Sequence, residues 1–416
     1  MTFLLPPWPV FEEDEVAAAS RVLRSGRVNY WTGEEVRAFE QECAEAVGCR
    51  YAVAVMNGTV ALELALHALD LPRGSEVILT PRTFIASASA VVLRGYVPVF
   101  ADVDPDSGNI TAKSIAKVIT RKTSAILVVH LAGWPCDMDP ILALATRHDL
   151  KVIEDCAQAN GATYKGRAVG SLGHVGCFSF CQDKIISTGG EGGMVTTNDE
   201  ALWRRAWEYK DHGKSHEAVY ERVHAPGFRW LHETFGTNWR LTELQAAIGR
   251  VQLRKLPAWS ATRRANMAQL LDGLEGHPLL RIPRAGESLG HAGYKAYVYL
   301  RPERMRSAWS RNRILEEIGR MGVPCFSGSC GEIYLEKAFT KRVLGPKKVL
   351  PVAHKLAETS LMFQVHPGIC SSHLNHMVAF IRLVLDEALV PAYLPAYLPA
   401  YLPGYLPGYL PARLHG

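Results

Sequence analysis

Short apolar runs alternate with amphipathic stretches between residues 51 and 197, and this alternation constrains the fold more than any other feature. Stretches such as Val60–Leu69 and Met138–His148 are long enough for crossover helices. The pattern is typical of βαβ units, in which helices cover both faces of a mostly parallel sheet. We therefore predict an α/β fold with a seven-stranded sheet. Its strands are expected at Tyr51–Met56, Glu76–Leu79, Val97–Ala101, Ala125–Val129, Val152–Glu154, Val175–Phe180 and Met194–Thr197.

The chain is long enough for more than one packed unit. It has 416 residues, about two to three times a typical single domain. Beyond Leu241 the pattern becomes helical, and short strands and helices near 296–300 and 313–321 indicate a smaller α+β domain. We predict a large domain over 1–257, a small domain over 258–388 and a tail over 389–416.

The tail repeats the tetrapeptide P-[AG]-Y-L. A proline at every fourth position removes backbone donors and fixes φ, so neither a helix nor a central strand can form. We predict that the tail is disordered, and docking of its tyrosines and leucines on a partner is the alternative.

Composition excludes several classes of protein. Lys plus Arg number 46 and Asp plus Glu number 41, and the resulting net charge of +5 is spread along the chain. A nucleic-acid partner is therefore not expected. No apolar run reaches membrane-spanning length, and the first ten residues do not resemble a signal peptide. The nine cysteines include no C-x-x-C pair, so we expect a cytoplasmic protein without a metal site.

The segment Asn57-Gly58-Thr59 directly follows the first predicted strand and precedes a helix. A helix N-terminus offers unpaired N–H groups and the positive end of the helix dipole. Gly58 would let the backbone approach a ligand closely, and Thr59 adds a hydroxyl. We predict a phosphate cradle here, with an ordinary N-cap as an equally supported interpretation.

A second polar group stands at the end of the fifth predicted strand, where Asp155 and Gln158 follow an apolar run. Ligands of open α/β sheets bind at the carboxyl ends of the strands. An ionised Asp155 could pair with a protonated ring nitrogen, and Gln158 could bond an adjacent oxygen. The alternative is an aspartate that caps a turn.

Lys184 follows the buried run ending at Phe180 and precedes a glycine-rich turn. A Schiff-base lysine is expected at such a place, because desolvation lowers the pKa of an amine and frees its lone pair. On position alone, a solvated lysine is the more frequent explanation. Phe84 opens a helix and could lie against a planar cofactor, or pack in the core. Asn238 at a helix start would usually be a cap.

Four of these features together indicate a site for pyridoxal 5′-phosphate (PLP). They are the phosphate cradle, an aromatic ring, an aspartate that could pair with a ring nitrogen and a lysine that could bind an aldehyde. The order and spacing of these motifs resemble the DegT/DnrJ/EryC1/StrS family of sugar aminotransferases over residues 9–385. The motifs are S-G-R-V-N-Y-W-T-G-E-E-V-R-A-F-E from Ser25, N-G-T-V-A-L-E-L-A-L from Asn57, T-P-R-T-F-I-A-S-A from Thr80, E-D-C-A-Q-A from Glu154, F-S-F-C-Q-D-K from Phe178 and G-T-N-W-R-L-T-E-L-Q-A-A-I-G from Gly236.

The resemblance implies the aspartate aminotransferase fold, PLP fold type I, and a role for each site residue. Lys184 would form the Schiff base, Asp155 would pair with the ring nitrogen, and Phe84 would stack on the ring. Gln158 would lie near the phenolic oxygen of the cofactor. The phosphate would be held by Gly58, Thr59 and Ser179, joined by Asn238 from the second subunit of a homodimer. Asn57 departs from the family, which often has serine there.

The resemblance also implies a reaction. An amino group, usually from glutamate, would pass to the keto group of a nucleotide-linked deoxysugar for surface polysaccharide or glycan synthesis, with C4 favoured over C3. One alternative is a PLP-dependent sugar dehydratase, in which histidine replaces the lysine. Another is a regulatory protein that keeps the fold without turnover. The presence of Lys184 argues against the dehydratase, and Lys184 and Asp155 together argue against the regulatory protein.

Overall fold

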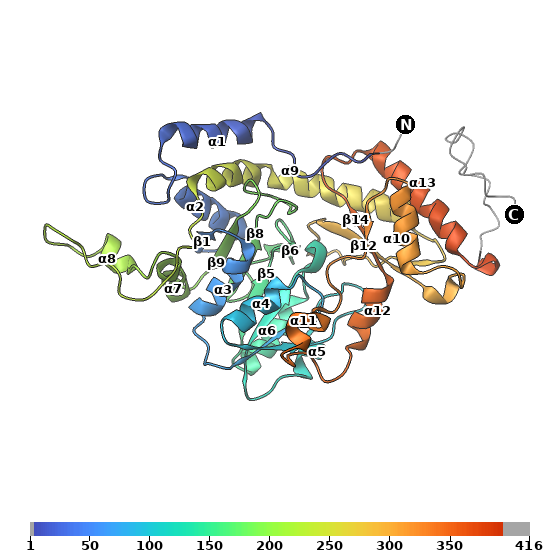
Figure 1. The fold of residues 1–416 in the computed structure, drawn as a ribbon, viewed down its shortest axis with the longest axis horizontal. Coiled ribbons are helices and arrows are strands. Elements are labelled where there is room, and N and C mark those ends of the chain that lie inside the picture. The colour runs from blue at the N-terminus through green and yellow to red at the C-terminus, as the bar shows by residue number, and fades with distance from the viewer. Residues whose placement is uncertain (1–3, 394–416) are drawn as a thin grey trace.

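The computed structural model describes residues 4–393, and a seven-stranded sheet forms its larger core (Figure 1). The strand order is β1-β9-β8-β5-β4-β2-β3. β9 runs antiparallel to both neighbours, and all other neighbouring pairs are parallel. The predicted α/β fold with a mostly parallel sheet is therefore confirmed. The strands are β1 (Tyr51–Val55), β2 (Glu76–Leu79), β3 (Val97–Phe100), β4 (Thr123–Val129), β5 (Lys151–Asp155), β8 (Val175–Ser179) and β9 (Gly193–Thr197).

Helices cover both faces of this sheet. On one face, Cys177 of β8 donates to the Ala61 carbonyl of α3 (Gly58–Ala68). Successive strand residues point to opposite faces, and Phe180, just beyond β8, meets Phe39 of α2 (Glu35–Val47) with ring centroids 5.4 Å apart. The other helices that follow the strands are α4 (Ala86–Leu93), α5 (Ala112–Ala116), α6 (Met138–Arg147) and α7 (Glu200–Lys210).

One long helix, α9 (Glu243–Leu274), runs along the molecule (Figure 1). Thr242 and Gln245 cap its start reciprocally. It packs against α1 (Glu13–Ser25) and α2, and also against α13 (Ser371–Ala388). The helix continues through Pro257, whose side chain is exposed. Val251 and Ser260 on either side are buried, and this packing keeps the helix continuous. The division of the chain at residue 257 stays a prediction.

A second hydrophobic cluster surrounds a four-stranded sheet with the order β10-β12-β14-β13. All neighbouring pairs in this sheet are antiparallel. The strand and helix expected near 296–300 and 313–321 correspond to β12 (Lys295–Leu300) and α10 (Arg311–Arg320). The remaining strands are β10 (Leu280–Arg281), β13 (Cys325–Phe326) and β14 (Ser360–Gln364), with β6 (Thr163–Tyr164), β7 (Arg167–Ala168) and β11 (Leu289–Gly290) in a small third sheet.

The segment between residues 210 and 237 carries the short helix α8 (His216–Tyr220) and projects from the body (Figure 1). Four apolar side chains beyond α8 are more than three-quarters exposed, namely Val223, Phe228, Trp230 and Phe235. The other short helices are α11 (Lys337–Thr340) and α12 (Pro351–Thr359), with 3-10 turns at Leu131–Gly133, Pro302–Arg304, Ile333–Leu335 and Pro391–Tyr393.

Most of the repeat tail predicted over 389–416 lies outside the described residues. Leu389, at its start, is buried in the smaller core. Between residues 4 and 393, no helix combines the length and hydropathy needed to cross a bilayer.

Candidate active site

Several predicted site residues meet at one edge of the large sheet. Asp155 ends β5, Ser179 ends β8, and Gly58 begins α3 directly after β1. These three strands point the same way, because β9 is antiparallel to both β1 and β8. Their carboxyl ends therefore share an edge, where α/β proteins bind ligands.

The turn at the start of α3 is tightly enclosed. A Cβ added to Gly58 would lie 2.6 Å from Cβ of Ser179, and one added to Gly193 would lie 2.4 Å from the carbonyl oxygen of Asn57. The Asn57 side chain caps the helix by accepting from the Val60 N–H over 3.0 Å. The N–H groups of the first helical turn have no partner within a helix. Backbone and the Ser179 hydroxyl thus approach closely at a helix N-terminus, an arrangement that suits a phosphate.

Asp155 is 4% exposed and accepts two hydrogen bonds. Oδ2 accepts from the Ser87 hydroxyl over 2.7 Å, and Oδ1 accepts from the Ala157 N–H over 3.1 Å. Burial raises the pKa of Asp155, and the bonds from Ser87 and Ala157 and the charge of Lys184 partly oppose that rise. A further positive group beside the carboxylate would lower the pKa again. The surroundings therefore suit a protonated ring nitrogen.

The amine of Lys184 is held by two neighbours. Nζ lies 3.3 Å from the hydroxyl of Tyr294 and 3.3 Å from Oδ1 of Asp183. Tyr294 in turn donates to Oδ2 of Asp183. Partial burial opposes the charge of Asp183, but Lys184 and Tyr294 outweigh it and lower its pKa. Tyr294 stands 110 residues from Lys184, so sequence reasoning missed it, whereas Asp183 was present in the motif F-S-F-C-Q-D-K.

Gln158 and Phe84 are placed differently. Gln158 accepts from the Ala132 N–H over 2.7 Å and donates to Ser329 over 3.3 Å, so both ends of its amide are engaged. To donate a hydrogen bond to a ligand oxygen, the Gln158 amide would have to give up its hydrogen bond to Ser329. Phe84 follows β2 and is 67% exposed, three residues before the buried Ser87. An exposed phenyl ring beside a buried carboxylate site suits a planar ligand.

Asn238 lies on a segment that passes beside the end of β1 and the cradle of its own chain, where Arg240 forms a bridge with Val55. The Asn238 side chain is exposed, and its backbone runs beside β1, where Trp239 accepts from the Met56 N–H over 3.0 Å. Among residues 4–393, no hydrogen bond joins Asn238 to Gly58 or Ser179. Within one chain the predicted residue thus passes near the cradle without bonding Gly58 or Ser179 in the described part of the chain, and its role in a second subunit stays a prediction.

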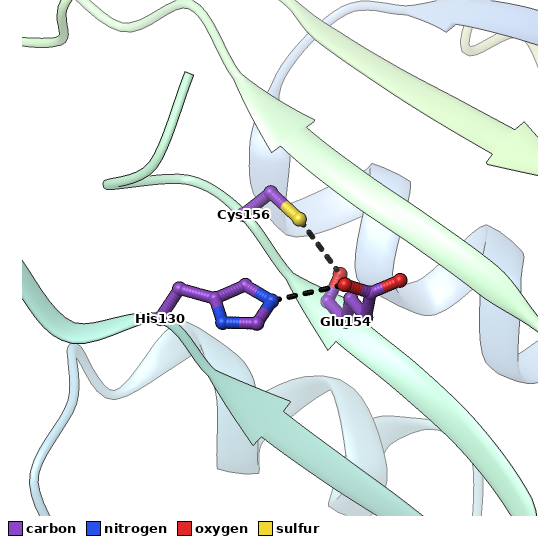
Figure 2. A group of neighbouring side chains, drawn as sticks. All are labelled: His130, Glu154 and Cys156. Carbon is purple, nitrogen blue, oxygen red and sulfur yellow. Dashed lines mark hydrogen bonds and ion pairs between the residues drawn. The ribbon is translucent and has the colours of Figure 1, made fainter. Parts of the chain in front are cut away.

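His130, Glu154 and Cys156 form a buried cluster, and the last two are the sequence neighbours of Asp155 (Figure 2). Glu154 accepts from Nε2 of His130 over 3.0 Å and from the N–H groups of Gly170, Leu172 and Gly173 over 2.7–2.9 Å. Nδ1 of His130 accepts from a backbone N–H, so Nε2 carries the proton. Burial raises the pKa of Cys156 well above its usual range. The carboxylate has all four acceptor positions filled, so we interpret the cluster as structural, not as a cation site.

The model of the DegT/DnrJ/EryC1/StrS aminotransferase family matches residues 9–382. The chain belongs to this family. The family resemblance seen in the sequence is thereby confirmed. The type I fold is confirmed with it, since solved structures of the family superpose on nearly the whole chain.

Two curated relatives have nucleotide-linked sugars in their names. GDP-perosamine synthase of Escherichia coli O157:H7 is 43% identical over 232 residues, which are 56% of this chain and 61% of that enzyme. The chain thus matches less than two-thirds of the length of that relative. UDP-N-acetyl-3-dehydro-alpha-D-glucosamine 3-aminotransferase of Acidithiobacillus ferrooxidans is 36% identical over 353 residues, covering 85% of this chain and 89% of that enzyme.

Two solved structures are similar along most of the chain. An aminotransferase from Psychrobacter cryohalolentis is 58% identical with a TM-score of 0.91, and the match covers 92% of this chain and 99% of that one. GDP-4-keto-6-deoxy-D-mannose-3-dehydratase of E. coli, solved with bound hydrated PLP, is 25% identical with a TM-score of 0.82, covering 91% and 100%.

PLP is the cofactor of this family member, as predicted. The residues present fit it. The enclosed turn at Gly58 offers a cradle for a phosphate, Asp155 is a buried carboxylate that gains from a positive neighbour, and Lys184 presents an amine on the same side.

Proposed function

We propose that this protein transfers an amino group from glutamate to the keto carbon of a nucleotide-linked deoxysugar, and that it works as a cytoplasmic homodimer in surface polysaccharide or glycan synthesis. Membership in the aminotransferase family and the names of the two curated relatives support this proposal. The observation that carries it is the placement of Lys184. Its amine lies close enough to the buried Asp155 for its positive charge to lower the pKa of that carboxyl group.

When bound, PLP supplies an electron-accepting ring and a reactive aldehyde carbon. The carboxylate of Asp155 keeps the ring nitrogen protonated, and the hydrogen bonds from Ser87 and Ala157 favour the ionised state of that carboxylate. Phe84 covers one face of the ring and excludes water from it. Gln158 orients the ring through its amide.

Nζ of Lys184 moves the proton. It takes the proton from the carbon that carries the amino group of glutamate and delivers a proton to the keto carbon of the sugar when the reaction runs in the other direction. Asp183 and Tyr294 act as positioning residues, because both touch Nζ at 3.3 Å and hold it at one place on the edge of the sheet.

The phosphate group is held by the backbone of Gly58, the hydroxyls of Thr59 and Ser179, and the side chain of Asn238 from a second copy of the chain. The exposure of Asn238, and the lack of a hydrogen bond from it to Gly58 or Ser179 within residues 4–393, support the contribution in trans.

The sugar nucleotide carries a diphosphate, which requires cationic partners. Arg27 and Arg229 are exposed cations, so we propose them as diphosphate ligands. Lys214 is a weaker candidate, because its amine is paired with Asp211 at 3.0 Å and lies over the Trp31 ring.

The test is a substrate panel. The PLP-loaded protein is incubated with ¹⁵N-glutamate and with nucleotide-linked 4-keto and 3-keto sugars, and the products are analysed by mass spectrometry and NMR. We expect ¹⁵N at the former keto carbon, with C4 favoured. Label at C3 would correct the position, as the name of the A. ferrooxidans relative suggests. Loss of a hydroxyl without label would establish a dehydratase, and no turnover of any sugar would overturn the proposal.

A further inference from the structure

A cluster of buried basic side chains lies next to Lys184. Arg263 on α9 is 1% exposed, and its Nε and Nη2 have no hydrogen-bond partner in the described part of the chain. His366, 2% exposed, likewise has two ring nitrogens without a partner between residues 4 and 393. Burying a charged group without a partner is costly. A guanidinium in this state indicates that a ligand completes its contacts.

Two short connections tie Arg263 to Lys184. The guanidinium lies 4.6 Å from the ring centre of Trp8, and Nε1 of Trp8 donates to the Lys184 carbonyl over 2.9 Å. On the other route, a Cβ added to Gly293 would lie 2.8 Å from Cβ of Arg263, and the next residue, Tyr294, contacts Nζ of Lys184. The first route thus leads from the guanidinium to the backbone of Lys184, and the second leads from the stem of Arg263 to the reacting amine.

The cluster carries more positive than negative charge. Burial lowers the pKa of Arg263 to about 9, so it is a cation at neutral pH. Burial lowers the pKa of Lys295 to about 8, where Asp183 opposes the shift and Arg263 and Lys184 add to it. Asp183 is the carboxylate that faces these cations. It already forms an ion pair with Lys184 and accepts a hydrogen bond from Tyr294.

Burial and the charges of Arg263 and Lys295 lower the pKa of His366 to about 4, so this ring is neutral. Trp8 stacks on it with centroids 5.6 Å apart. Lys295 also lines a cavity of about 220 Å³, whose lining does not include Arg263 or His366. Because the charges of Arg263 and Lys295 act on each other and on His366, an anion bound between them would meet two cations and a neutral hydrogen-bonding ring.

We propose that Arg263, assisted by Lys295, binds a carboxylate of the amino donor, a role that rests on the proposed function. The donor has to place its amino group at Lys184, so its carboxylates must lie within a few bonds of that amine. The planar fork of a guanidinium matches a carboxylate in two parallel hydrogen bonds. The site would thus select amino acids over amines that lack a carboxylate.

The test measures binding without turnover. Glutarate has the two carboxylates of glutamate and no amine, so it cannot react with the PLP-loaded protein. Calorimetric titration should give a Kd for glutarate that rises about tenfold or more in Arg263→Gln. Arg254→Gln is the matched control, because Arg254 is exposed on the same helix, and its Kd should stay within about twofold of wild type.

Two further variants keep the test informative if Arg263→Gln folds poorly. Arg263→Lys retains the charge but loses the fork, and Lys295→Met leaves α9 intact. Both should weaken glutarate binding while the melting temperature stays near that of wild type. Wild-type affinity in both variants would overturn the proposal, as would inorganic phosphate that binds more tightly than glutarate.

The outcome separates this site from the proposed function. The half-reaction with glutamate is followed by cofactor absorbance in the absence of sugar, and its KM should rise in Arg263→Gln. If glutarate binding depends on Arg263 while wild type aminates no sugar, the carboxylate site stands and the proposed function fails. If wild type aminates a sugar and Arg263→Gln binds glutarate normally, the carboxylate site alone fails.

Discussion

Ser87 donates a hydrogen bond to Oδ2 of Asp155 over 2.7 Å, and both side chains are buried. Ser87 stands in the first turn of α4, and its hydroxyl is also bonded to that of Thr83 over 2.8 Å. A donor to a carboxylate stabilises the ionised form. The charge of the residue at the end of β5 therefore depends on a helix that follows β2.

Ser87→Ala should weaken PLP binding. Without this donor, burial raises the pKa of Asp155 further, and less of the carboxylate is ionised at a given pH. A hydrogen bond to a charged group contributes about 1.5–3 kcal/mol, so the Kd for PLP should rise at least about tenfold. Absorbance titration of the cofactor-free protein measures it, and acid release of PLP should move to higher pH. Ser89→Ala on the same helix is the control, and equal Kd values for the two variants would contradict the account.

Gly58→Ala should impair retention of the phosphate group. The new Cβ would lie 2.6 Å from Cβ of Ser179, so the turn has to move. Affinity for PLP should fall much more than affinity for pyridoxal, which lacks the phosphate. Gly319→Ala, near the end of α10 with no atom within 4 Å of the added Cβ, should leave both unchanged. Equal losses for the two ligands would show that the cradle does not hold the phosphate.

Asn238 can be tested with mixed dimers. Lys184→Ala and Asn238→Ala homodimers should each be impaired. If Asn238 acts in trans, a heterodimer of the two variants contains one site with both residues intact, and it should recover about half of the wild-type activity per dimer. Differently tagged chains purified together provide the sample. A heterodimer no more active than the Asn238→Ala homodimer would assign the residue to its own chain.

Glu154→Gln should destabilise the fold. The amide would point at least one N–H group toward donors that now face a carboxylate, and His130 would lose its charged partner. A buried donor left without its acceptor costs about 1–3 kcal/mol, which urea unfolding would detect. Added chelator should leave wild-type stability unchanged. A variant as stable as wild type would contradict the structural role of the cluster.

The seven strands of the large sheet were predictable because each appears as a short apolar run, and all except the edge strand β3 are buried on both faces. The antiparallel direction of β9 was not predictable, since it depends on how the glycine turn after Lys184 connects β8 to β9. Strands of two residues, such as β10 and β13, are too short to show a period. Pro257 indicated a boundary, whereas packing on both sides keeps α9 continuous.

The site was predictable where its residues follow directly on a strand, as Asp155, Gly58 and Lys184 do. Their partners come from elsewhere in the chain. Tyr294 precedes β12, and Trp8 reaches Lys184 from the N-terminal segment. No local pattern encodes such tertiary contacts. Ser87 was the partner closest to being predictable, since it lies in the quoted motif T-P-R-T-F-I-A-S-A after the strand that neighbours β4.

The most direct test of the central claim is reduction of the PLP-loaded protein with borohydride, followed by peptide mapping. Lys184 is the lysine placed between a buried strand and the glycine turn, with its amine held by Tyr294 and Asp183. The account predicts a yellow protein in which the reduced cofactor is attached to the peptide containing Lys184, and none in Lys184→Ala. Attachment at another lysine, or at none in the wild-type protein, would contradict it.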